Sequence, residues 1–199
     1  MTKTKLLIIN ASLNGNHGNT FHCFKKIESL LNDLCEIKML ELKNLNQLSS
    51  KDYQKVIEEE IKVADALYFM TGTYWDSWSS YLQRFLEEST FLEATPTLFA
   101  KPAGVFTTMH SVSGKEVMSR LQGVLSSQGY LIPPHSSLTI SLASELARKS
   151  ESSFQDDFWS MDEILHTIKN VLSYARHSTK ANAWSVDHKD PKRLWITLV

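Results

Sequence analysis

Residues 6–20 read LLIINASLNGNHGNT, and this stretch decides the fold. Its first four residues, Leu6 to Ile9, are continuously apolar, which is typical of a parallel strand covered on both faces. A polar loop follows, and then a helix predicted over residues 19–34. The apolar residues of that helix recur at steps of three and four: Phe21, Phe24, Ile27, Leu31 and Leu34. A buried strand that leads through a polar loop into an amphipathic helix is the opening unit of an α/β fold.

The same alternation repeats along the chain. Strands are predicted at 37–42, 66–70, 102–106 and 131–140, and helices at 52–64, 79–89, 115–128 and 156–176. Asp52 is expected to cap the second helix and Gly129 to end the fourth. Three residues of the second helix are expected to face inward: Val56, Ile61 and Val63. Five strands alternating with helices predict a doubly wound parallel sheet of order 2-1-3-4-5 with helices on both faces.

The length of 199 residues suits one domain, predicted to span residues 1–177. The remaining residues, 178–199, do not continue the alternation but contain Trp184 and Trp195. Because tryptophans near a terminus usually need burial, this tail is predicted to pack on the domain or on a partner subunit.

Composition excludes several classes of protein. The formal net charge is −1, with 22% charged residues, so there is no basic footprint for nucleic acid, and a strongly charged electron carrier is disfavoured. No apolar stretch is long enough to cross a membrane. The two cysteines, Cys23 and Cys35, form no disulfide framework and no metal-ligand spacing, so they are expected to be reduced thiols in a cytoplasmic protein without a metal site.

The loop from Asn10 to Thr20 contains the residue types expected of a ligand-binding site. Ligands of such sheets bind beyond the carboxyl ends of the strands, where the strand order reverses. Glycines let the backbone approach a ligand, hydroxyls and amides donate hydrogen bonds, and the following helix N-terminus favours an anion. The loop lacks the lysine of a nucleoside triphosphate site and the G-x-G-x-x-G spacing of a dinucleotide site. It therefore predicts a phosphate cradle; the alternative is a plain polar loop in which Asn19 caps the helix.

Three stretches together resemble a known family. Asn10-Ala11-Ser12 with Gly18-Asn19-Thr20 is similar to the phosphate loop of the NADPH-dependent FMN reductase and NAD(P)H:quinone reductase group. Residues 71–79, TGTYWDSWS, resemble that group's loop after the third strand, and residues 101–108, KPAGVFTT, its fourth strand, with 110–116 as the loop at the flavin edge. The resemblance spans about residues 5–130 and implies the flavodoxin-like fold.

The resemblance also implies a function. FMN would be the cofactor and NAD(P)H the co-substrate, and the reduced flavin would pass electrons to a quinone-like or other small acceptor, commonly in a homodimer. Ser12, Asn19 and Thr20, with the Gly18 N–H, would hold the phosphate, and His17 would add a donor. Thr73, Tyr74 and Trp75 would meet the flavin ring. The other edge of the ring would be flanked by Thr107, Thr108, Met109, His110 and Ser111. His110 is the one candidate for a catalytic side chain, because flavin N5 itself carries the hydride.

Two residues depart from the pattern of the family. Gly72 stands where the family usually has proline, and Asp76 where it usually has glycine. One hypothesis is that the Asp76 carboxylate lowers the flavin reduction potential or turns outward, and the alternative is that it caps the helix near Ser79. These departures keep open a second function, a flavodoxin-like binding or regulatory module with weak or lost FMN binding. A third possible function is that of a one-electron carrier.

Overall fold

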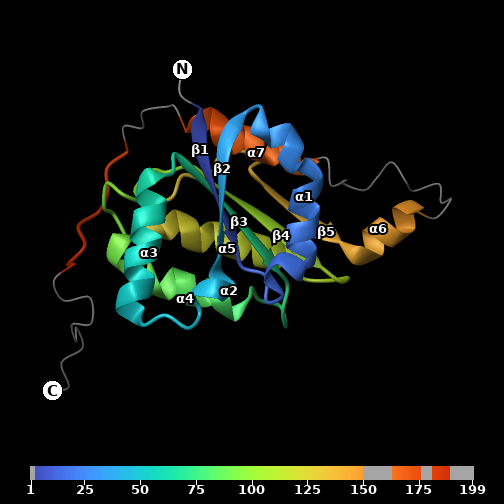
Figure 1. Cartoon of the computed structure of the whole chain (residues 1–199), viewed down its shortest axis with the longest axis horizontal. Coiled ribbons are helices and arrows are strands. Elements are labelled where there is room, and N and C mark those ends of the chain that lie inside the picture. The colour runs from blue at the N-terminus through green and yellow to red at the C-terminus, as the bar shows by residue number, and fades with distance from the viewer. Residues whose placement is uncertain (1–2, 150–162, 176–180, 189–199) are drawn as a thin grey trace.

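The computed structural model describes residues 3–149, 163–175 and 181–188. Its five strands form one parallel sheet of order β2-β1-β3-β4-β5, which confirms the predicted order (Figure 1). The strands are β1 (Thr4–Asn10), β2 (Cys35–Glu41), β3 (Ala66–Gly72), β4 (Ala103–Met109) and β5 (Ser137–Ser141). The apolar runs that predicted β1 and β3 are buried almost completely, as their place inside the sheet requires.

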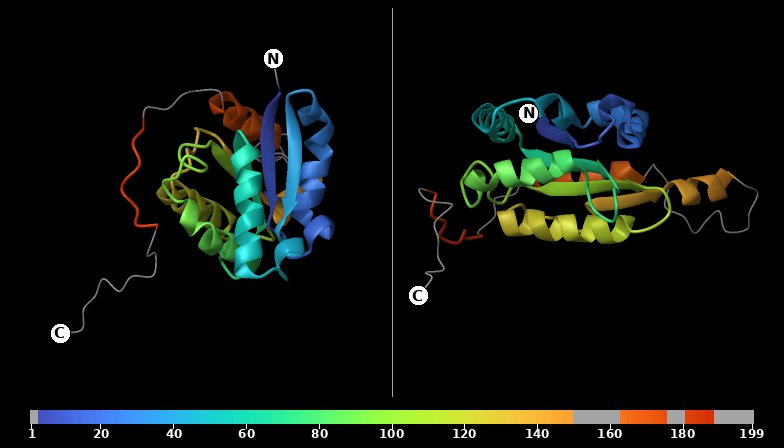
Figure 2. Two further views of the ribbon diagram at one scale, coloured as in Figure 1. Left: turned by 60° about the vertical axis from the view of Figure 1, so that its left-hand side comes forward. Right: turned by 90° about the horizontal axis from the view of Figure 1, so that it is seen from below.

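Helices cover both faces of the sheet (Figures 1 and 2). They are α1 (Asn19–Asn32), α2 (Leu42–Leu45), α3 (Ser50–Val63), α4 (Ser80–Glu88), α5 (Gly114–Gln128), α6 (Leu142–Lys149) and α7 (Glu163–Tyr174), with single 3₁₀ turns at η1 (Gly15–His17) and η2 (Thr90–Leu92). Gly129 ends α5 in the left-handed conformation, as predicted.

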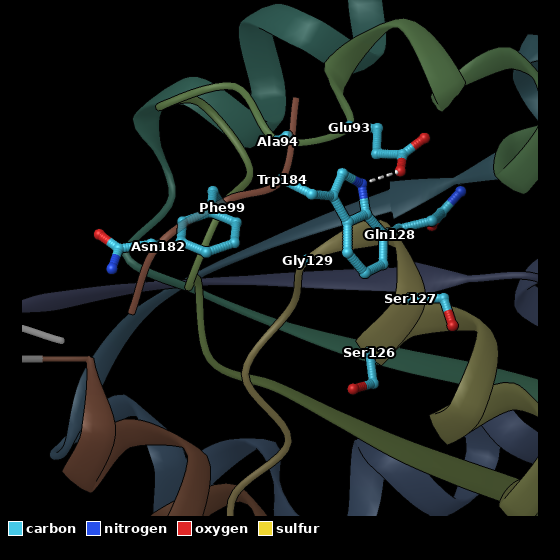
Figure 3. A pocket seen from close by; sticks show the side chains of 9 residues that line it. All are labelled: Glu93, Ala94, Phe99, Ser126, Ser127, Gln128, Gly129, Asn182 and Trp184. Atoms are coloured by element: carbon cyan, nitrogen blue, oxygen red, sulfur yellow. Dashed lines mark hydrogen bonds between the residues drawn. The ribbon is translucent and has the colours of Figure 1, made fainter. Parts of the chain in front are cut away.

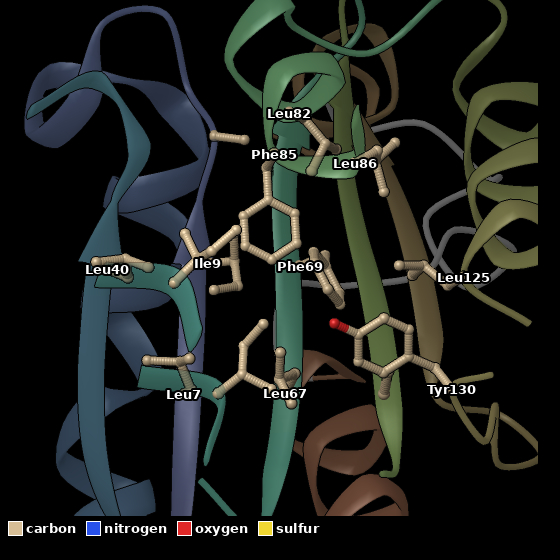
Figure 4. Close-up of a cluster of buried hydrophobic side chains, with 14 of the residues drawn as sticks. Leu7, Ile9, Leu40, Leu67, Phe69, Leu82, Phe85, Leu86, Leu125 and Tyr130 are labelled. Atoms are coloured by element: carbon tan, nitrogen blue, oxygen red, sulfur yellow. The ribbon is translucent and has the colours of Figure 1, made fainter. Parts of the chain in front are cut away.

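Each face of the sheet has its own core. On the face covered by α3, α4 and α5, Phe69 of β3 packs edge-to-face against Phe85 and Tyr130, with ring centroids 5.7 and 5.6 Å apart (Figure 4). On the face covered by α1 and α7, the buried Tyr68 hydroxyl hydrogen-bonds to the Thr167 hydroxyl at 2.5 Å. Alternate residues of one strand thus anchor opposite layers, and the loops beyond the strand ends rest on a rigid sheet.

The structure corrects the predicted helix ends. Ser49, not Asp52, caps α3: its Oγ accepts a hydrogen bond from the Asp52 N–H at 3.2 Å. Val63 and Leu34 were expected to face the core but are 56% and 41% exposed. Val63 is the last residue of α3 and Leu34 lies beyond the end of α1, so neither is on the buried stripe of its helix.

The fifth strand and the helices after it also differ from the prediction. β5 begins only at Ser137, and Leu131 makes an isolated bridge to Pro102 instead of starting the strand. The helix α6 was not predicted; it follows β5 directly and extends away from the sheet (Figure 1). Of the helix predicted at 156–176, α7 is the described part, and the residues 156–162 and 176 lie outside the described residues.

Two residues of the described stretch 181–188, Asn182 and Trp184, lie beside η2 and the end of α5. The Trp184 indole N–H donates a hydrogen bond to Glu93 Oε1 at 2.7 Å, and the ring borders a small cavity with Phe99 and Gln128 (Figure 3). The indole is nevertheless 63% exposed. Trp195, the other tryptophan of the predicted tail, lies outside the described residues.

Candidate functional site

A cavity of about 240 Å³ lies beyond the carboxyl ends of β1, β3 and β4. The chain leaves β1 toward β2 on one side and returns to β3 on the other, so the cavity sits where the strand order reverses. The residues that line it come from the ends of β3 and β4, from the loops after the three strands, and from the starts of α1 and α6: Ser12, Asn14, Gly18, Asn19, Thr20, Gly72, Thr73, Tyr74, Thr108, Met109, His110 and Leu142.

The loop after β1, residues 11–18 (the β1 loop), is held by its own hydrogen bonds. Ser12 Oγ accepts from the Asn14 N–H at 3.3 Å, and the Ser12 carbonyl accepts from the Gly15 N–H at 3.0 Å. Gly18 is the N-cap of α1, and no side chain caps that end, so the alternative in which Asn19 caps the helix is wrong. The first N–H groups of α1 are therefore free to meet an anion.

Two features of the β1 loop and of the residues around it fit a phosphate group. A Cβ atom on Gly18 would lie 1.9 Å from Ser12 Oγ, so the close approach of these residues requires glycine. The Oγ1 atoms of Thr20 and of Thr73, on the neighbouring β3 loop, are buried and have no hydrogen-bond partner among the described residues. A buried hydroxyl without a partner costs about 1–3 kcal/mol, and phosphate oxygens would accept from both.

The part of the cavity beside the β1 loop can attract an anion although no lysine or arginine lines it. Among the described residues that line the cavity, none is a lysine, arginine, aspartate or glutamate. Phosphate would therefore be held by main-chain N–H groups, by hydroxyls and by the dipole of the 14-residue helix α1. Such a site suits a phosphate monoester better than a triphosphate with magnesium, which needs a lysine and metal ligands.

Tyr74 joins the two sides of the cavity. Its hydroxyl accepts a hydrogen bond from the Leu13 N–H of the β1 loop at 3.3 Å. Its ring lies over Gly72, where an added Cβ would be 3.0–3.2 Å from three ring and hydroxyl atoms. The glycine that replaces the expected proline thus makes room for this tyrosine to fold back over the strand end.

Tyr74 begins a tight turn, residues 74–77 (the Trp75 turn). The Tyr74 N–H donates to the Ser77 carbonyl at 2.8 Å and the Ser77 N–H to the Tyr74 carbonyl at 3.0 Å. Trp75 and Asp76, the two central residues, have positive φ values of 47° and 57°, the pattern of a type I′ turn. Residues other than glycine held there store strain of the order of 1–3 kcal/mol each. The positive φ gives a physical reason for the glycine expected at position 76.

The side chains of the two central residues of the Trp75 turn lie outside the cavity lining. Trp75 is fully exposed, Asp76 is exposed, and neither lines the cavity. Asp76 also does not cap α4, because Ser79 does so by accepting from the Leu82 N–H at 3.2 Å. The outward orientation of Asp76 is one of the two outcomes allowed by the hypothesis about its carboxylate.

The end of β4 and the loop after it supply the third side. Thr108, Met109 and His110 line the cavity, and the His110 carbonyl accepts from Ser141 Oγ at 3.2 Å and from the Ala143 N–H at 3.1 Å. These bonds bring the start of α6, with Leu142, to the rim.

Besides Asp76, four other predicted site residues do not line the cavity: His17, Trp75, Thr107 and Ser111. His17 and Ser111 are exposed. Thr107 is fully buried, and its hydroxyl bonds to the Gly114 carbonyl at 3.3 Å and to the Thr139 hydroxyl at 2.7 Å. Conversely, the predicted set lacked Asn14, Gly72 and Leu142. Asn14 lay within the quoted polar loop, whereas Leu142 gave no signal because α6 was not predicted.

Comparison with known protein families identifies the family to which the chain belongs. A family model described as NADPH-dependent FMN reductase matches residues 4–145, which include all five strands and every residue that lines the cavity. The chain belongs to this family. FMN is accordingly its cofactor and NAD(P)H its co-substrate, and the buried free hydroxyls, the open helix end and the neutral lining described above fit the FMN phosphate.

Solved structures agree on the fold, which is flavodoxin-like. RosB with bound 8-demethyl-8-formylriboflavin-5′-phosphate matches with a TM-score of 0.70 at 16% identity, over 98% of this chain and 96% of that one. A flavodoxin, WrbA-like protein from Agrobacterium tumefaciens gives 0.55 at 17%, over 88% and 98%. The flavoenzyme NAD(P)H:(acceptor) oxidoreductase FerB from Paracoccus denitrificans gives 0.52 at 18%, over 87% and 93%. No curated protein sequence matches the chain.

Neither cysteine lines the cavity. Both cysteines are free thiols, and burial raises the pKa of Cys23 and of Cys35 to about 11. Within the described residues no cluster of side chains could hold a metal ion. None of the described helices is long and apolar enough to cross a membrane.

Proposed function

We propose that this protein transfers electrons from NAD(P)H through bound FMN to a quinone-like or other small acceptor. The observation that carries the proposal is the pair of buried hydroxyls without partners, on Thr20 and Thr73, beside the open N-terminus of α1. In the absence of an anion these groups destabilise the fold, and a phosphate at this point would satisfy them together.

Different residues of the cavity would bind the phosphate and exclude water. Ser12 and Thr20, with the N–H groups of Gly18 and Asn19, would hold the phosphate, and Thr73 would bond to it or to the adjoining part of the ligand. Tyr74, Met109 and Leu142 would form apolar walls that exclude water. When bound, FMN supplies the chemistry of hydride acceptance and onward electron transfer.

His110 would act at the rim of the cavity, where its imidazole can donate a hydrogen bond to the flavin edge or to the acceptor. Trp75 stands beside the mouth with its whole indole exposed. We propose that it meets the ring edge or an incoming planar acceptor from outside the cavity, instead of lining the cavity itself.

The test begins with flavin retention. The purified chain is mixed with excess FMN, desalted, and its absorbance recorded before and after anaerobic addition of NADPH or NADH. We expect retained flavin bands that bleach with at least one nicotinamide cofactor. A colourless chain would favour the binding or regulatory module, and retained flavin that neither cofactor reduces would favour a one-electron carrier.

The acceptor is tested separately. With FMN bound, oxidation of NAD(P)H is followed with a water-soluble benzoquinone and, in parallel, with oxygen as the only acceptor. We expect the quinone to accelerate turnover, and equal rates would remove the quinone from the proposal. The FMN-free chain is the control for direct reaction between the quinone and the nicotinamide.

A second candidate is an enzyme that takes riboflavin 5′-phosphate as its substrate. It is favoured by one observation: the RosB match, whose structure contains an altered flavin 5′-phosphate, extends over nearly the whole chain, past residue 145 where the family match ends. The mass of the flavin recovered after turnover separates the two. An unchanged mass supports the oxidoreductase, and a changed mass supports the flavin-modifying enzyme.

We further propose a homodimer in the cytoplasm, with residues 1–177 as the domain and 178–199 as a tail that packs on the domain or on a partner subunit. The hydrogen bond from Trp184 to Glu93 supports the first arrangement of the tail. Sedimentation of the full chain and of a chain truncated after residue 177 tests both ideas. Loss of the dimer on truncation would place the tail at the interface, whereas loss of stability alone would place it on its own domain.

A further inference from the structure

We propose that Arg120 is a positioning residue, which holds the Trp75 turn in its strained conformation and thereby fixes Tyr74 in the wall of the FMN cavity. The part that concerns FMN rests on the proposed function, whereas the part that concerns the turn does not. No motif pointed to this arginine, which lies on α5, 44 residues beyond Asp76.

Arg120 makes two contacts with the turn and a third with Trp78, the residue after it. One guanidinium nitrogen donates to the Asp76 carbonyl oxygen at 2.9 Å, and the other approaches Ser77 Oγ at 3.4 Å. The guanidinium carbon lies 5.3 Å from the centre of the Trp78 ring, within the range of a cation–π contact. Glu116, one helical turn earlier, places a carboxylate 3.7 Å from the guanidinium and so helps to orient it.

The Trp75 turn needs support because its own residues do not favour its shape. A type I′ turn requires positive φ at both central positions, where asparagine and glycine are the preferred residues. Here the positions hold tryptophan and aspartate, at 47° and 57°. The carbonyl that Arg120 binds belongs to the second of these residues, so relaxation of the turn would move that oxygen away from its donor.

The turn is coupled to the cavity through Tyr74. This residue forms both main-chain hydrogen bonds of the turn with Ser77, and its hydroxyl accepts from the Leu13 N–H of the β1 loop. A relaxed turn would therefore lose a wall of the cavity and a bond to the phosphate side at once. Arg120 itself does not line the cavity, so its effect on FMN would be transmitted through the turn.

A second arginine provides a matched control. Arg84 on α4 likewise donates two hydrogen bonds, here to the carbonyl oxygens of Asn46 at 2.6 Å and of Leu48 at 2.7 Å, and its guanidinium lies 4.4 Å from the centre of the Tyr53 ring. It does not line the cavity. Arg84→Gln thus removes the same kinds of contact as Arg120→Gln at a place that does not hold the Trp75 turn.

The first experiment measures amide hydrogen exchange in the FMN-free chain. Arg120→Gln is expected to lower the protection of the Tyr74 and Ser77 amides by about tenfold or more, because the turn then opens at lower free energy. Arg84→Gln should leave these two amides unchanged. Unchanged protection in Arg120→Gln would overturn the proposal, whether or not FMN binds.

The second experiment measures the dissociation constant of FMN by flavin fluorescence. In the native turn, Arg120→Gln should weaken binding by about 10- to 30-fold. In a chain whose turn is Trp75→Asn with Asp76→Gly, the same change should weaken it by less than about threefold, because that turn keeps its shape unaided. Equal losses in both backgrounds, or no loss in the native turn, would overturn the proposal. If the native chain binds no FMN but Arg120→Gln lowers the protection of the Tyr74 and Ser77 amides, the proposed function fails, while the proposal that Arg120 holds the Trp75 turn stands.

Discussion

The β1 loop and the Trp75 turn meet at one cavity but keep their shapes by different means. Ser12 accepts hydrogen bonds from within the β1 loop, and Gly18 removes the Cβ that would collide with it. The Trp75 turn instead holds two ordinary residues at positive φ, with Arg120 bonded to it from a helix outside.

The difference lies in where each region stores its unfavourable free energy. Beside the β1 loop, at Thr20 and Thr73, it is stored as buried hydroxyls without partners among the described residues, which a ligand can relieve. In the Trp75 turn it is stored as backbone strain, which a ligand's phosphate cannot relieve. FMN should therefore stabilise the first region directly, while the second has to be supported by the protein alone.

The largest effect is expected from Gly18→Val. The backbone of Gly18 has φ −85°, which any residue adopts, so the change acts only through the collision of the new side chain with Ser12 Oγ. FMN binding should weaken by about 100-fold or more, which is about 2.7 kcal/mol, as measured by flavin fluorescence titration.

Gly123→Ala is the control for Gly18→Val. Gly123 lies inside α5, and a Cβ there meets nothing within 4 Å. We expect it to raise the free energy of unfolding by about 0.5–1 kcal/mol and to leave FMN binding unchanged. Similar losses of FMN in both glycine variants would mean that the β1 loop has no special role.

Thr20→Val should separate stability from binding. It removes a buried hydroxyl that has no partner, so the FMN-free chain should gain about 1 kcal/mol in urea unfolding. FMN affinity should fall by about 10- to 30-fold, because a hydrogen bond to a charged phosphate is lost. Thr90→Val, at an exposed threonine outside the cavity, should not weaken FMN binding. A less stable FMN-free chain would show that the Thr20 hydroxyl is already satisfied.

Relief of the backbone strain in the Trp75 turn should also stabilise the chain. Trp75→Asn together with Asp76→Gly replaces two strained residues with the pair that a type I′ turn prefers. Both side chains are exposed, so no core contact is lost, and the free energy of unfolding should rise by about 1–2 kcal/mol. A fall in stability would mean that the native turn is not strained.

The smallest effect concerns the thiols. Burial raises the pKa of Cys23 and Cys35 from 9.0 to about 11, so the folded chain keeps protons that the unfolded chain releases above pH 9. The free energy of unfolding should therefore fall between about pH 9 and pH 11. Urea unfolding with a reductant at several pH values measures it. A chain with Cys23→Ala and Cys35→Ala should show a shallower fall than the native chain, and equal slopes would contradict the prediction.

The sequence predicted most of what depends on local patterns. Apolar runs such as Leu6 to Ile9 can be recognised without tertiary information, and their alternation with helices predicted the doubly wound order that the sheet has. The β1 loop was predicted as a cradle for the same reason, since its glycines and hydroxyls follow one another along the chain. Of the site residues predicted there, four line the cavity, namely Ser12, Gly18, Asn19 and Thr20, whereas His17 is exposed and does not.

What depends on distant contacts was not predicted. Arg120 acts across 44 residues, and Leu142 reaches the rim only because β5 delivers the start of α6 beside His110. The choice between Ser49 and Asp52 as a cap could not be made either, since a hydroxyl and a carboxylate both cap well and the entry of the chain into α3 decides.

The most direct test compares the affinity of the chain for FMN with its affinity for riboflavin, which lacks the phosphate. If the cavity is a phosphate cradle, FMN should bind about 100-fold more tightly or better, and Thr20→Val should reduce that ratio by about tenfold. Equal affinities for the two flavins would contradict the account, because the free hydroxyls and the helix end would then have no ligand that needs them.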